Sequence, residues 1–117
     1  MIDYAIEKLI SYALDKELIQ PCEKIWALNS LLEVLELDSY TPTGKEVGEV
    51  DLPAVLDELM DDAYARGVMK ENSIVYRDLF DTKIMGALTP RPAQVIGKFQ
   101  ALYRENPEAA TDWYYQF

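Results

Sequence analysis

The stretch that decides the fold is IDYAIEKLISYA, residues 2–13. Its apolar side chains recur every three or four positions, which is the spacing of one face of an α-helix, whereas Asp3, Glu7 and Lys8 fall on the other side. The apolar positions are Ile2, Ala5, Ile6, Leu9, Ile10 and Ala13. This spacing predicts an amphipathic helix that buries one face in a core.

The same apolar face recurs fifty residues further along the chain. Adding fifty to each apolar position gives another apolar residue, namely Leu52, Val55, Leu56, Leu59, Met60 and Ala63. Asp51 as N-cap and Pro53 in the first turn predict where this helix begins, and Gly67 predicts where it ends. We infer two related helix-turn-helix hairpins, at about 2–36 and 51–87, although any two amphipathic helices also match at some offset by geometry alone.

Breaks and caps place the other elements. Pro21 suits the first turn of a second helix, and residues 38–49 (DSYTPTGKEVGE) have no period and read as a loop. The Thr-Pro-Arg-Pro sequence at 89–92 interrupts the helical pattern, because proline lacks a backbone N–H and restricts the residue before it. A fifth helix follows, and Asn106 with Pro107 predicts the start of a sixth.

No segment alternates in the manner of a strand, so the sequence predicts an all-α fold. The two hairpins and two C-terminal helices would form a single helical domain over residues 1–117, as the N-terminal part of a longer protein. The last helix carries Trp113, Tyr114 and Phe117, and we expect these aromatic side chains to form an exposed apolar patch that the rest of the longer protein would cover.

Composition excludes several classes of protein. The chain holds 21 acidic and 11 basic residues, and its net charge of -10 disfavours nucleic acid and anionic membrane surfaces as partners. No run of about 18 apolar residues predicts a membrane span. The single cysteine, Cys22, cannot form an internal disulfide, which fits a cytoplasmic protein.

Few residues offer catalytic chemistry. The chain has no histidine, which removes the commonest general base and metal ligand, and we predict no metal site and no cofactor. Cys22 fits a structural thiol better than a reactive one. The acids Asp57, Glu58, Asp61 and Asp62 fit a solvated helix face better than a cation site.

Basic residues gather in one part of the chain. Residues 66–104 hold 7 cations and 3 anions, whereas residues 1–65 hold 4 cations and 15 anions. Arg77, Lys83 and Arg91 lie beside the 89–92 break, where helix-start backbone groups also favour an anion. They are our candidates for contacting a phosphate-bearing substrate or an acidic neighbouring domain. The alternative is that Arg77 pairs with Asp81 one turn on and that the other cations are solvated.

A resemblance rests on this region. The segment YRDLFDTKIMGALTPRPAQVIGKFQALY (76–103), followed by ENPEAATDWYY (105–115), resembles the N-terminal region of class II galactose-1-phosphate uridylyltransferases, the bacterial UDP-glucose:hexose-1-phosphate uridylyltransferases. The likeness extends through the whole chain, but its specific part is 77–92. The matching polar residues are Arg77, Asp78, Asp81, Thr82, Lys83, Thr89 and Arg91, none with an established role.

The resemblance implies a cytoplasmic enzyme of Leloir galactose metabolism that exchanges UMP between UDP-glucose and galactose 1-phosphate. In better characterised relatives a histidine carries the uridylyl group through a double displacement. Because this chain has no histidine, its catalytic centre would lie outside the 117 residues, and its partners would include the remainder of the same polypeptide.

Two other readings come from different classes of protein. A self-contained helical protein–protein interaction module would use the paired hairpins to hold a partner helix. A DNA-binding helix-turn-helix protein is disfavoured, because the turn regions carry as many acids as cations.

Overall fold

The computed structural model describes residues 2–68 and 74–114, without the side chains of residues 74, 75 and 114. These residues form six α-helices and one short 3-10 helix, and none of them lies in a strand. The elements are α1 (Ile2–Asp15), η1 (Pro21–Glu23), α2 (Lys24–Val34), α3 (Leu52–Ala65), α4 (Ile74–Ala87), α5 (Ala93–Glu105) and α6 (Pro107–Tyr114). The predicted all-α fold is confirmed.

Helices α1, α2 and α3 end in the same way. One residue just past each helix takes a left-handed conformation, with φ of 56° at Glu17, 53° at Glu36 and 78° at Gly67. The next N–H then donates back to a carbonyl of the last turn; after α1, Leu18 donates to Ala13 at 2.8 Å. This is the Schellman arrangement, which satisfies carbonyl groups that a helix end leaves unpaired. Gly67 was predicted as the end of its helix, and this prediction is confirmed.

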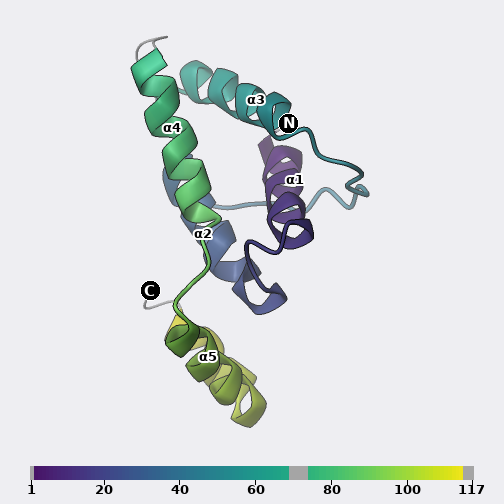
Figure 1. Ribbon diagram of the computed structural model, residues 1–117, viewed down its shortest axis with the longest axis vertical. Helices are drawn as coiled ribbons and strands as arrows, with labels where there is room; N and C mark the ends of the chain where they lie inside the picture. Colours follow the sequence, from purple (N-terminus) through teal and green to yellow (C-terminus); the bar gives the residue numbers. More distant parts are fainter. Residues whose placement is uncertain (1, 69–73, 115–117) are drawn as a thin grey trace.

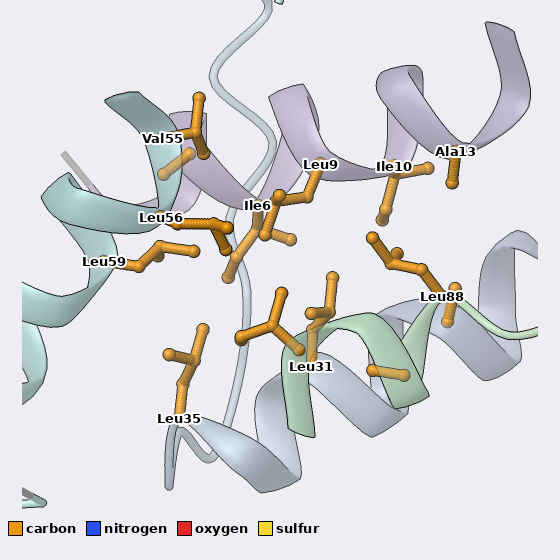
Figure 2. Close-up of a cluster of buried hydrophobic side chains, with 14 of the residues drawn as sticks. Ile6, Leu9, Ile10, Ala13, Leu31, Leu35, Val55, Leu56, Leu59 and Leu88 are labelled. Carbon is orange, nitrogen blue, oxygen red and sulfur yellow. The ribbon is translucent and has the colours of Figure 1, made fainter. Parts of the chain in front are cut away.

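The main core lies among the four helices α1, α2, α3 and α4. Helix α1 packs on α3, and α2 packs on α4 (Figure 1). Figure 2 shows side chains from these helices converging on one interior, with Leu88 reaching in from the residues after α4. Ile6, Leu9, Leu31 and Leu59 are fully buried there. At about 1.5–3 kcal/mol for each large apolar side chain, this burial is the chief stabilising contribution to the fold.

A second, smaller cluster attaches α5 and α6. It consists of Trp26 from α2, Phe99 from α5 and Ala110 from α6, with Trp113 packed beside them. The rings of Trp26 and Phe99 meet edge to face, with centroids 5.0 Å apart. The C-terminal helices therefore dock on the start of α2 and lie away from α1 and α3 (Figure 1).

This docking elongates the molecule. The Cα radius of gyration is 15.0 Å, whereas a compact chain of 117 residues would have about 13 Å. None of the helices within 2–68 and 74–114 is long and apolar enough to cross a membrane. Of the aromatic patch predicted on the last helix, Trp113 is half-buried against the second cluster. The side chain of Tyr114 and all of Phe117 lie outside the part of the chain that the structure describes.

Candidate functional site

The break at residues 89–92 joins the two clusters, and Arg91 is its central residue. Its guanidinium donates hydrogen bonds to the Thr89 carbonyl at 3.1 Å and to the Ser30 hydroxyl of α2 at 3.0 Å. Its backbone N–H is the one donor between two prolines, and it donates to Glu23 Oε2 at 2.6 Å. Arg91 thus ties the break to α2 and η1.

Glu23 is the acceptor that organises this junction. Its residue is 1 % exposed, and the other carboxylate oxygen accepts the Gln20 N–H at 2.9 Å. Buried carboxylates are stable only when such donors replace water. The sequence suggested that backbone groups at the break would face an external anion. The backbone N–H of Arg91 instead donates to the carboxylate of Glu23.

The other two candidate cations lie in different surroundings. The Arg77 guanidinium pairs with Asp57 of α3 and lies 3.9 Å from Asp81. The predicted pairing with Asp81 is therefore present, and a second acid joins it. Lys83 is exposed and lines a hollow of about 420 Å³ with Glu33, Tyr76 and other residues of α2 and α4.

The structure therefore assigns the three cations separate contacts: Arg77 to α3, Lys83 to the surface between α2 and α4, and Arg91 to η1 and α2. In the described residues they do not assemble into one phosphate cradle. Convergence of several donors on one point is what a phosphate site requires. Arg77 and Arg91 make contacts within the chain, whereas Lys83 is exposed and is therefore the most accessible of the three to a ligand.

The acidic face of α3 is partly neutralised. Asp62 pairs with Arg66 one turn on, at 2.5 Å, and Glu58 lies 3.8 Å from Lys8 of α1. With the Arg77 pair to Asp57, three of the four acids on this face have cationic neighbours. Within the described ranges, no group of acids, cysteine or histidine is arranged to hold a metal ion.

Cys22 has the surroundings of a structural thiol. It is half-buried, and Gln100 Nε2 of α5 lies 3.8 Å from its Sγ. Burial raises the pKa of the thiol, which lowers the fraction of reactive thiolate.

Sequence reasoning missed a cluster around Glu7. The loop that follows α2 returns to α1, where Glu7 Oε1 accepts the Tyr40 hydroxyl at 2.7 Å and the Thr43 N–H at 3.0 Å. The Thr43 hydroxyl donates to the other oxygen. The hydrogen bonds from Thr43 and Tyr40 lower the pKa of Glu7 against its partial desolvation. Glu7 was placed on the solvated side of its helix, and its spacing alone gives no signal of a loop partner.

Comparison with known proteins decides the family. The sequence model of the galactose-1-phosphate uridyl transferase N-terminal domain matches residues 19–117. The chain belongs to this family. The resemblance found at residues 76–115 is therefore confirmed, and no solved structure matches the chain.

Three relatives in the galactose-1-phosphate uridyl transferase family show the extent of the match. Each is named galactose-1-phosphate uridylyltransferase. The protein from Butyrivibrio fibrisolvens is 43% identical over 117 residues, which are 99% of this chain and 30% of the relative. The protein from Clostridium acetobutylicum is 39% identical over 99% of this chain and 23% of the relative. The protein from Halalkalibacterium halodurans is 38% identical over 96% of this chain and 22% of the relative. The chain spans less than a third of the length of these relatives.

Proposed function

We propose that this chain is the N-terminal helical domain of a cytoplasmic uridylyltransferase that exchanges UMP between UDP-glucose and galactose 1-phosphate. The observation that carries the proposal is family membership over residues 19–117, together with relatives named for this activity. Its partners are then these two substrates and the remainder of the same polypeptide.

The catalytic centre of this enzyme lies outside the 117 residues in our proposal. Displacement at phosphorus needs a positioned nucleophile and donors that stabilise the phosphate charge. The chain has no histidine, and its one thiol is half-buried with a raised pKa. Its role is accordingly to support a centre built elsewhere, with Arg77, Lys83 and Arg91 as candidates for contacts with substrate or with the catalytic part.

Two assays test this function. The 117-residue chain is incubated with UDP-glucose and galactose 1-phosphate, and UDP-galactose is followed; we expect none. A chimera in which this chain replaces the matched region of the Butyrivibrio fibrisolvens relative is expected to form UDP-galactose. Turnover by the isolated chain would disprove an outside catalytic centre, and a folded but inactive chimera would count against the proposed function.

The cations are tested in the same chimera. Lys83→Met is expected to lower kcat/KM more than Lys98→Met, because Lys98 is exposed and its Nζ lies over the Trp113 ring, 5.1 Å from the centroid. Arg91→Met is expected to lower it as well, through the junction at Glu23 and Ser30. Equal kcat/KM for all three variants would show that Lys83 and Arg91 do not contribute to the activity.

We also propose that the two hairpins are related by an internal repeat of fifty residues. The bounds of α1 and α3 differ by fifty at both ends, and the turns after them have equivalent hydrogen bonds. Five buried positions correspond too, from Ala5 and Val55 to Ala13 and Ala63. Superposition of 2–26 on the described parts of 52–76 tests the repeat, and helix pairs that do not overlay would reject it.

A further inference from the structure

The strongest unexplained feature is a pair of adjoining surface hollows at η1 and the start of α2, which we together call the groove. One hollow of about 630 Å³ lies between this segment and α5, and Pro21, Phe99 and Tyr103 contribute to its lining. A second hollow of about 370 Å³ lies against α1 and the loop after α2, with Leu14, Leu28 and Val47 in its lining. Both hollows include Lys24 and Ile25 in their lining, so they adjoin at the start of α2.

The groove exposes large apolar side chains that the fold does not cover. Ile25 is 38% exposed and Tyr103 is 53% exposed, although neighbouring Trp26 and Ala27 of α2 are buried. Helix α2 is apolar on more than its core side, so burying one face leaves Ile25 outside. Exposed apolar side chains that line a hollow are candidates for a binding surface.

Charge narrows the nature of the occupant. Lys24 lines both hollows, and Arg104 and Lys45 line one each, in a chain whose net charge is -10. One acid, Glu7, lines the groove, and its carboxylate is hydrogen-bonded to Tyr40 and Thr43. The groove thus combines apolar and cationic lining residues, which complements an apolar segment flanked by acids.

We propose that the part of the uridylyltransferase polypeptide outside these 117 residues docks in this groove through apolar side chains flanked by acidic ones. This inference rests on the proposed function. More than two thirds of each relative lies outside the region that this chain matches. A body of that size has ample surface for an interface with the helical domain, and stable interfaces have an apolar centre with a polar rim.

Thiol labelling tests the groove directly. Tyr103→Cys places a thiol in the groove, and Ala54→Cys places one on an exposed position of α3 away from it; both are made with Cys22→Ser. Maleimide labelling rates are compared between the 117-residue chain and the chimera with the Butyrivibrio fibrisolvens relative. We expect the chimera to slow labelling of the groove thiol about tenfold or more and that of the α3 thiol by less than about twofold.

Three results would overturn the proposal: equal rates for the groove thiol in chain and chimera, equal slowing of both thiols, or slowing in the isolated chain that increases with its concentration. The last would assign the groove to a second copy. UDP-galactose formation is measured separately, so an active chimera with an unprotected groove rejects the docking alone. A protected groove in an inactive chimera rejects the proposed function alone.

A binding measurement covers the case in which the chimera does not fold. The 117-residue chain is mixed with the unmatched part of the relative, and affinity is measured by calorimetry. Ile25→Glu removes an apolar contact of the groove and adds an acid there, and we expect it to weaken binding at least tenfold. Ala54→Glu is the control. Absence of binding, or equal loss in both variants, rejects the groove.

Discussion

At the scale of single residues, Glu23 shows how one buried carboxylate fixes a junction. It accepts the backbone N–H of Gln20, three residues before it, and that of Arg91, 68 residues after it. We predict that Glu23→Ala lowers the free energy of unfolding by about 2–4 kcal/mol, because both donors lose a buried acceptor. Glu23→Gln keeps one acceptor oxygen and should cost about half as much. Urea denaturation measures both.

The control for Glu23 is Glu33→Gln, since Glu33 is an exposed carboxylate on α2. Its unfolding free energy should stay within about 0.5 kcal/mol of the unchanged chain. If Glu23→Ala were equally mild, the junction would not depend on this carboxylate.

Glu7 predicts a pH dependence. The folded chain lowers the pKa of Glu7 below 4.5 through hydrogen bonds from Thr43 and Tyr40, aided by the charge of Lys45. A carboxyl whose pKa is lower in the folded state stabilises the fold above its unfolded pKa, and this contribution is lost as pH falls. The difference in urea midpoint between the unchanged chain and Glu7→Gln should therefore narrow as pH falls below 4.5.

The matched variant for this titration is Glu49→Gln, because Glu49 is exposed in the same loop. Its midpoint difference should change less over the same pH range. A constant difference for Glu7→Gln would show that its hydrogen bonds do not favour the ionised carboxyl.

At the scale of elements, two helix caps predicted in the same way differ in the structure. Asn106 Oδ1 accepts the N–H groups of Glu108 and Ala109 at 3.1 and 3.3 Å, as an N-cap does. Asp51 occupies the equivalent position before α3, but its side chain makes no capping hydrogen bond. Asn106→Ala should therefore lower the free energy of unfolding by about 1 kcal/mol, and Asp51→Ala should lower it clearly less. Urea denaturation and far-UV circular dichroism compare the pair, and equal losses would contradict the assignment.

The elements also show what the sequence could predict. Periodicity placed the buried faces of α1 and α3 correctly, because their apolar positions leave the opposite side polar. It could not place the ends of α1 and α2, where Glu17 and Glu36 adopt the left-handed conformation that glycine usually supplies. It also could not distinguish Ile25 from Trp26, since both are apolar neighbours and tertiary packing decides which is buried.

At the scale of the whole molecule, the positions of the candidate cations depended on long-range contacts. Arg77, Lys83 and Arg91 lie within 15 residues of one another in the sequence, yet Arg77 binds α3 and Arg91 binds η1 and α2. Their proximity in the sequence made all three candidates for the same kind of contact, with a phosphate-bearing substrate or an acidic domain, whereas the structure gives them separate surroundings. The docking of α5 and α6 on α2 is equally non-local, because Trp26 and Phe99 belong to different parts of the chain.

The last prediction concerns this docking. Trp26 is 2% exposed and belongs to the second cluster, so Trp26→Ala removes the main contact of α2 with α5 and α6. The C-terminal pair should then move away while the main core stays folded, and the radius of gyration measured by X-ray scattering should increase. Leu59→Ala is the control, since Leu59 is fully buried in the main core. The free energy of unfolding should fall by about 3–5 kcal/mol in both variants, but only Trp26→Ala should expand the native state. Equal radii of gyration for the two variants would show that Trp26 does not hold the C-terminal helices in place.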